Sequence, residues 1–182
     1  MARGTEAQGS RPELTEAEDF RAAWVELEGR WPETIARARE LPPAAVHERV
    51  KGEWSFVQTL RHLLFVTDAW VSRAVLGDSA PYHPLGLPPT GMKNPAVPND
   101  LEAQPSLDEV LALREGRVAV ARDVLADLTD DALADSTLRV RGPGYPRAGT
   151  YPLRRCVTVL VSEEWQHRLY AERDLAVLLT RG

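Results

Sequence analysis

His62, Glu163 and His167 are the residues whose types and spacing best suit a chemical site. Glu163 precedes His167 by four residues within a helical pattern, so both side chains lie on one face of that helix. His62 belongs to a second helical pattern, in which its neighbours three and four positions away are mostly inward-facing. If the two helices face each other, two imidazole nitrogens and one carboxylate oxygen converge. Three such ligands with open positions are typical of a catalytic metal site, and they suit Zn²⁺ as well as Ni²⁺, Fe²⁺ or Mn²⁺.

The same residues also have a purely structural interpretation. Glu163 and His167 have the spacing of an ion pair between successive turns of a helix. His62 could then be a core histidine whose nitrogens bond to neighbouring groups. Residue types and spacing leave both interpretations open.

Four more polar residues near these helices carry a similar choice. Cys156 lies two turns before Glu163 and is either a nucleophile or a small core residue. His83 is either a further ligand at the end of the bundle or a surface histidine. Asp174 either accepts from an imidazole N–H or pairs with a nearby arginine. Glu164 points about 100° away from Glu163 along the helix, so it is expected in solvent or at a rim.

The elements that must position these residues are four helices with apolar residues at helical spacing. Spacings typical of capping boxes begin three of them, at Thr15 with Glu18, Ser55 with Gln58, and Ser106 with Glu109. Pro42 and Pro43 end the first helix, and Gly77 is a natural cap for the second. The expected helices span residues 15–41, 56–76, 106–128 and 152–179.

Two long irregular connections separate the later helices. Residues 78–105 contain seven prolines, and residues 129–151 contain the turn signal Gly142-Pro143-Gly144. We therefore predict an all-α protein, a four-helix bundle over residues 15–182 that follows a flexible tail at 1–14. The first long connection is long enough to run the length of the bundle, which permits an up-down-down-up order.

Composition narrows the classes of partner. The chain of 182 residues carries 22 Lys and Arg against 27 Asp and Glu, a net charge of −5, so a nucleic-acid partner is not expected. No apolar run is long enough to span a membrane, and no signal peptide is predicted. The single cysteine excludes an internal disulfide and fits the cytoplasm. The broad apolar surface of the 56–76 helix predicts a homodimer.

Two segments resemble the DinB superfamily: SFVQTLRHLLFVTDAWVSRAVLG at 55–77 and SEEWQHRLYAERDL at 162–175. The resemblance covers the chain after residue 15 and implies a DinB-like four-helix bundle with a long second connection. It also implies a metal held by one histidine on the second helix and two ligands four residues apart on the fourth. Carried over by position, these ligands are His62, Glu163 and His167. The Glu-x3-His arrangement resembles that of mycothiol-dependent maleylpyruvate isomerases.

The resemblance further implies a function based on thiol activation. We expect a divalent-metal-dependent S-transferase or isomerase that uses a low-molecular-weight thiol of the mycothiol type on an electrophilic small molecule. The alternatives are a non-catalytic, stress-related binding or interaction protein and a metal-dependent hydrolase. The family's thiol-binding arginine has no clear counterpart, and Arg61 and Arg73 are the two arginines considered for that role.

Overall fold

A computed structural model describes residues 12–181, and these residues form a helical bundle. Its long helices are α1 (Ala17–Arg39), α2 (Phe56–Thr67), α3 (Leu107–Ala126) and α5 (Leu153–Leu179). A π-helical turn, η2 (Asp68–Arg73), extends α2, and two short helices, η1 (Ala45–His47) and α4 (Asp130–Ala134), lie in the connections. Within residues 12–181 there is no strand, only two isolated bridges, Ser136 with Pro152 and Val140 with Gly149. The all-α prediction is therefore confirmed, whereas the tail predicted at 1–14 lies mostly outside the described residues.

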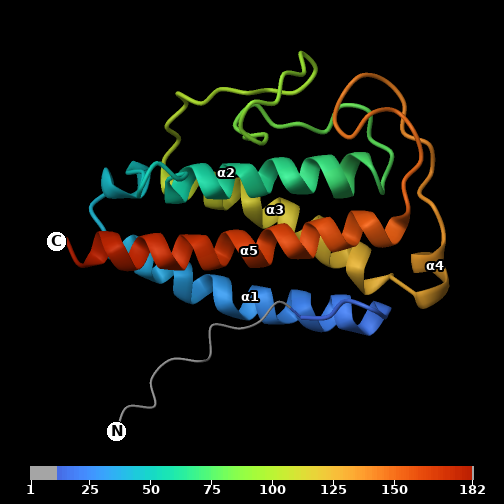
Figure 1. Cartoon of the computed structure of the whole chain (residues 1–182), viewed down its shortest axis with the longest axis horizontal. Helices are drawn as coiled ribbons and strands as arrows, with labels where there is room; N and C mark the ends of the chain where they lie inside the picture. The colour runs from blue at the N-terminus through green and yellow to red at the C-terminus, as the bar shows by residue number, and fades with distance from the viewer. Residues whose placement is uncertain (1–11, 182) are drawn as a thin grey trace, which may run out of the picture.

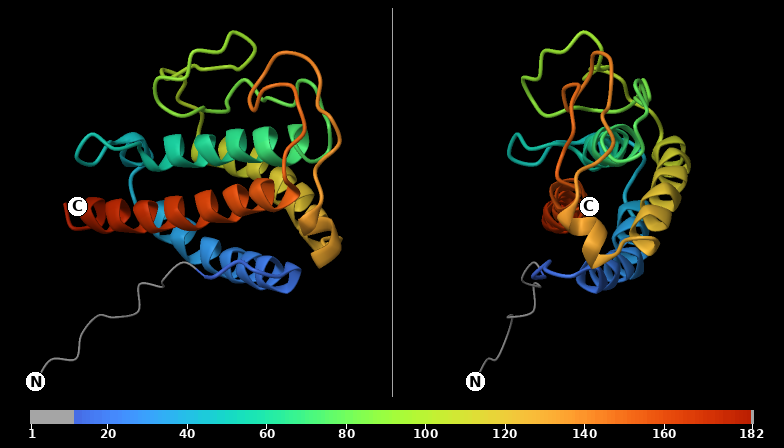
Figure 2. Two further views of the ribbon diagram at one scale, coloured as in Figure 1. Left: turned by 45° about the vertical axis from the view of Figure 1, so that its right-hand side comes forward. Right: turned by 90° about the vertical axis from the view of Figure 1, so that its right-hand side faces the viewer.

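The helices follow an up-down-down-up order (Figures 1 and 2). α1 and α5 run in one direction, and α2 and α3 run in the other. The connection between α2 and α3 therefore returns along the whole bundle, and this explains its 28-residue length. The bundle places α5 beside both α1 and α2, so the two helices that carry the candidate ligands are antiparallel neighbours.

Capping boxes begin three of the helices, and two of them are where the sequence predicts them. Ser55 Oγ accepts from the Gln58 N–H at 3.2 Å, and Gln58 Oε1 accepts from the Ser55 N–H at 3.1 Å. Ser106 and Glu109 make the equivalent pair at α3. The box predicted at Thr15 and Glu18 is wrong.

Helix α1 instead has Glu16 as its N-cap, paired with Asp19. The Asp19 carboxylate accepts from the backbone N–H groups of Thr15 at 2.9 Å and Glu16 at 2.8 Å. One carboxylate thus satisfies two N–H groups at the helix start, and these bonds lower the pKa of Asp19.

The apolar surface of α2 is covered within the chain. Its lower face joins the main core with α1, α3 and α5. Its upper face forms a second apolar cluster beneath the two long connections, with Phe65, Trp70, Val97 and Cys156 among its members. The surface that suggested a homodimer is therefore explained by intrachain packing, and the homodimer stays a prediction.

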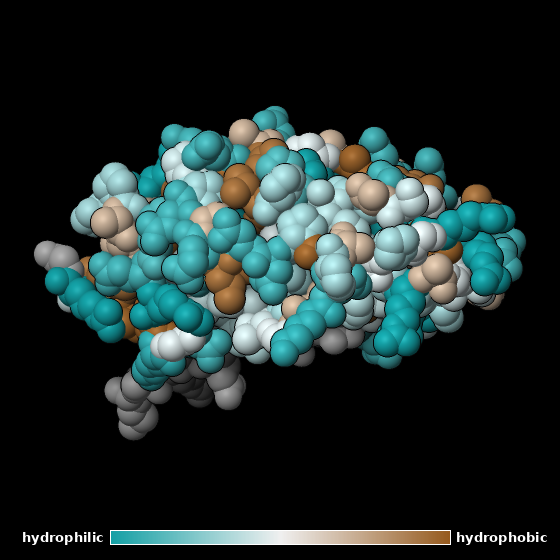
Figure 3. All heavy atoms as spheres, turned by 90° about the horizontal axis from the view of Figure 1, so that it is seen from above, coloured by the Kyte–Doolittle hydropathy of each residue, from teal (hydrophilic) through white to brown (hydrophobic). Residues whose placement is uncertain are grey.

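The outer side of these connections is mostly hydrophilic, with small separate apolar patches (Figure 3). None of the helices within residues 12–181 combines the length and apolar character needed to span a bilayer.

Candidate metal centre

His62 projects from α2 toward α5 and is almost fully buried, with 4% of its surface exposed. Its Nδ1 lies 2.9 Å from the carbonyl oxygen of Leu87, in the proline-rich connection. A carbonyl can only accept, so Nδ1 carries the proton and donates it to Leu87. The other nitrogen, Nε2, is left as the one that can bind a cation.

His167 lies on α5 and approaches His62, with ring centroids 4.7 Å apart. Its Nδ1 lies 3.0 Å from the backbone carbonyl oxygen of Glu163, one turn earlier. By the same logic this nitrogen donates, and Nε2 keeps its lone pair. Burial, followed by the nearby His62, lowers the pKa of His167, so its imidazole is neutral at pH 7.

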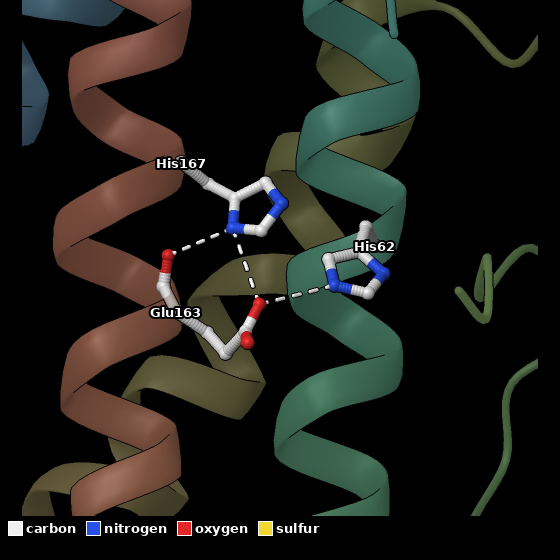
Figure 4. Close-up of side chains that lie close together, drawn as sticks. All are labelled: His62, Glu163 and His167. Carbon is white, nitrogen blue, oxygen red and sulfur yellow. Dashed lines mark hydrogen bonds and ion pairs between the residues drawn. The ribbon is translucent and has the colours of Figure 1, made fainter. Parts of the chain in front are cut away.

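The Glu163 carboxylate lies between the two imidazoles (Figure 4). Its Oε2 is 3.3 Å from His62 Nε2 and 3.3 Å from His167 Nδ1. Its contact with the His62 ring lowers the pKa of Glu163 despite its partial burial, so the side chain is an anion at pH 7.

The three side chains fit a divalent cation. One ligand atom from each of them lies within 4.8 Å of the others. Zinc-to-ligand distances of about 2.0–2.1 Å in a tetrahedral site separate the ligands by about 3.3 Å, which matches the distance between Glu163 Oε2 and His62 Nε2. The protonation of the site also agrees with a cation. Because His62 Nδ1 donates to Leu87, Nε2 has a lone pair that faces the anionic Glu163 oxygen. A cation bound by both atoms would remove the repulsion between them.

A pocket of about 230 Å³ opens beside this cluster, with His167 in its wall. The Trp54 ring covers both imidazoles, with its centroid 4.6 Å from that of His62 and 6.0 Å from that of His167. Tyr170 packs edge-on against His167 at 5.9 Å. The remaining lining residues are Arg49, Gly52, Glu53, Thr59, Thr90 and Asp174.

The expected position of Glu164 is wrong. It is 2% exposed and lies between α1, α3 and α5, where it bonds Arg114 at 2.9 Å and Trp31 Nε1 at 2.9 Å. The buried stripe of α5 runs through Val157, Leu160, Val161 and Glu164. The core face of the helix is therefore centred on Glu164, while Glu163 lies at its edge beside the pocket.

Three other candidate residues, Cys156, His83 and Asp174, make contacts that serve the fold. Cys156 is fully buried in the apolar cluster above α2, and burial raises its pKa to about 11, so it is no nucleophile. His83 lies outside the metal cluster, and its Nδ1 accepts from the Leu85 N–H at 3.1 Å. Asp174 lines the pocket but bonds Arg173 at 2.7 Å, so the arginine pair is the correct alternative for it.

Neither arginine considered for thiol binding faces the pocket. Arg61 and Arg73 are both fully buried, and each donates to three backbone carbonyls of the long connections. Their guanidinium groups are thus occupied within the protein, and neither is available to a ligand.

Sequence reasoning missed one contributor to the site, the backbone carbonyl of Leu87. The Leu87 carbonyl has no side-chain signal at all, because any residue in that place would supply the same oxygen.

Comparison with known proteins agrees with this geometry. A model of the DinB superfamily matches residues 26–171, a range that contains all three residues of the cluster. Comparisons with curated proteins and with solved structures gave no match. The family match covers well over half of the chain, and the chain therefore belongs to the DinB superfamily.

Proposed function

We propose that this protein is a divalent-metal-dependent transferase that joins a low-molecular-weight thiol, of the mycothiol type, to an electrophilic small molecule. The observation that supports the proposal best is the convergence of His62, Glu163 and His167, with His167 in the wall of an open pocket. In the overall reaction the thiol loses its proton and its sulfur bonds the electrophilic carbon. The leaving group departs with its bonding electron pair.

The three cluster residues would hold the metal. When bound, a divalent cation, with Zn²⁺ as the first choice, lowers the pKa of a thiol or a water molecule placed in an open coordination position. Glu163 contributes a negative charge, because its pKa is lowered. His62 and His167 contribute neutral nitrogens, each oriented by the carbonyl that its Nδ1 bonds.

The size and lining of the pocket suit a small substrate. Its volume of about 230 Å³ admits a reactive group rather than a polymer. Trp54 excludes water from the His62 side, since its ring packs on that imidazole. Thr59 and Thr90 add hydroxyl groups to the wall, and these can bond polar atoms of a ligand. The buried single cysteine and the need for a reduced thiol favour the cytoplasm.

The test begins with metal content. Elemental analysis of protein purified without a metal-affinity tag should give about one metal per chain for the wild type and little for Glu163→Ala. The loaded wild type should then conjugate mycothiol to monochlorobimane, and His62→Ala should abolish the fluorescent product. His83→Ala is the matched control, because this histidine lies outside the cluster, and it should retain the activity.

Three results would overturn the transferase. Conjugation that persists in His62→Ala shows that the cluster has no part in it. A loaded wild type that consumes neither mycothiol nor bacillithiol, but cleaves an ester without added thiol, is a hydrolase. A loaded bundle that turns over neither thiol nor ester is a binding protein.

A further inference from the structure

Residues 85–87 of the proline-rich connection lie directly on α2, next to the ligand His62. The Leu87 N–H donates to the Arg61 carbonyl at 3.1 Å, and the Leu87 carbonyl accepts from His62 Nδ1 at 2.9 Å. Between the two leucines, a Cβ added at Gly86 would touch Phe65 Cβ of α2 at 3.6 Å, an ordinary contact, and would crowd the His83 carbonyl oxygen of the connection itself at 3.1 Å. The backbone of this segment therefore sets where the acceptor for His62 lies.

The Arg61 side chain holds this segment from within. It is 0% exposed and donates to the carbonyl oxygens of Leu85 at 2.8 Å, Ala103 at 2.8 Å, and Asp100. These carbonyls come from both ends of the connection, so one guanidinium fixes the segment beside His62 to the segment that enters α3. Burying a charge is costly, and the three hydrogen bonds to carbonyl oxygens offset part of that cost.

We propose that Arg61 is a positioning residue of the metal centre, acting through residues 85–87 to orient His62 and to fix the proton on its Nδ1. The inference rests on the metal-binding part of the proposed function. The chain of contacts is short: the Arg61 side chain bonds Leu85, and two residues later the Leu87 carbonyl bonds His62. With that carbonyl in place, Nε2 is the free nitrogen and faces Glu163. At metal sites, the group that bonds the other ring nitrogen of a histidine ligand sets the orientation and basicity of that ligand.

The chain supplies a matched control in Arg73. It is equally buried and also donates to three backbone carbonyls, those of Pro146, Ser79 and Gly142. Among the described residues, the segments that carry those carbonyls make no hydrogen bond to His62, Glu163 or His167. Arg61→Lys and Arg73→Lys therefore remove the same chemistry from the same kind of place, and both should lower stability.

Two measurements on the full chain test the proposal. The first is Zn²⁺ affinity by competition with a chromophoric chelator near neutral pH. Arg61→Lys should weaken it by about 10–100-fold, the usual effect of losing a partner behind a metal ligand, and Arg73→Lys should change it less than twofold. The second is the ¹⁵N resonance of His62 Nδ1 in metal-free protein at mildly alkaline pH. It should have the protonated position in wild type and Arg73→Lys, and move toward the unprotonated position in Arg61→Lys.

Gly86→Val is a second variant in case Arg61→Lys fails to fold. Its Cβ would crowd the His83 carbonyl oxygen at 3.1 Å, so the variant should shift residues 85–87 while Arg61 stays in place, and it should reproduce both changes. Equal affinities in the two arginine variants, or a His62 resonance unmoved by Arg61→Lys and Gly86→Val, would overturn the proposal. If the wild type binds no Zn²⁺, the metal-binding function fails by itself, and the metal-free resonance still decides the role of Arg61.

Discussion

Glu163 and Glu164 are adjacent in α5 but have different surroundings. The Glu163 side chain is 37% exposed beside the pocket and lies between two imidazoles. Glu164 is buried among α1, α3 and α5, where Arg114 bonds it through two nitrogens. These two adjacent residues are thus a candidate metal ligand and a member of a core ion pair, and substitutions can separate their roles.

Replacing Glu164 by Gln should destabilise the fold without removing the metal. The substitution leaves Arg114 as a buried charge without its counterion, which costs about 3–5 kcal/mol. Urea unfolding followed by circular dichroism measures the loss, and elemental analysis checks that the metal remains. Glu163→Gln should show the reverse pattern, with no metal and with the stability of the metal-free wild type. A Glu164→Gln variant as stable as the wild type would contradict the structural role of this pair.

Cys156 should be unreactive in the folded protein. Burial raises its pKa to about 11, so the reactive thiolate is scarce at neutral pH and solvent does not reach it. Iodoacetamide at pH 8 should leave the native protein unmodified and alkylate it fully in urea, as mass spectrometry would detect. Rapid alkylation of the native protein would show that the apolar cluster above α2 opens.

At the scale of elements, the two long connections are joined by a compact contact around Gly144. The Tyr82 hydroxyl donates to the Tyr145 carbonyl at 2.7 Å and accepts from the Tyr145 N–H at 2.7 Å. Arg73 reaches the same place from η2 and bonds Pro146 and Gly142. Gly144 has a φ of +149°, and an added Cβ would lie 2.6 Å from the Tyr82 hydroxyl and 2.8 Å from Arg73 Cζ.

Gly144→Ala should therefore loosen the 135–151 connection. The methyl group has no room, and an L side chain is strained at this φ. Limited proteolysis should cut within 135–151 faster than in the wild type. Gly116→Ala on α3 is the control, because an added Cβ there meets nothing within 4 Å, and alanine favours the helix. Equal cleavage rates in both variants would contradict the contact described here.

The long helices could be predicted because their signals are local. Capping residues and apolar spacing place α3, α5, and α2 taken together with η2, within a few residues of their observed bounds. Glu164 was expected in solvent or at a rim, but it belongs to the buried face of α5. That face is a regular stripe of positions, two of them charged: 157, 160, 161, 164, 168, 171 and 175. The helical spacing of the apolar residues around Glu164 indicates a core position for it despite its charge. Its partner, Arg114, is 50 residues away in the sequence, so no local pattern could reveal the pair.

Other features depend on tertiary contacts alone. The π-helical turn at η2, where the Leu76 N–H bonds the Val71 carbonyl, lies in a pattern that predicts an ordinary helix. The hydrogen bonds of Arg61 and Arg73 could not be predicted from the sequence either, because their partners are backbone carbonyls of the long connections. The convergence of His62, Glu163 and His167 was expected from their types and spacing together with the resemblance to the DinB superfamily, and metal binding by these residues stays a prediction.

At the scale of the whole molecule, the up-down-down-up order of the helices determines which residues can meet to form the site. Because α2 and α5 are antiparallel neighbours, His62 meets Glu163 across 101 residues of sequence. The Leu87 carbonyl behind His62 comes from the connection that returns along the bundle. The cluster therefore depends on the assembled bundle, and an unfolded chain retains only the Glu163–His167 pair on one helix.

Metal should consequently stabilise the native bundle, since it binds the folded chain far better than the unfolded one. At a free Zn²⁺ concentration of 100 times the dissociation constant, the free energy of unfolding rises by about 2.7 kcal/mol. Differential scanning fluorimetry should show a melting temperature that climbs with Zn²⁺ in the wild type and in His83→Ala. Glu163→Gln, which keeps the bundle but loses the ligand that joins both imidazoles, should melt at the same temperature at every Zn²⁺ concentration. An equal rise in that variant would mean that zinc acts elsewhere on the protein, and the link between the fold and this site would be lost.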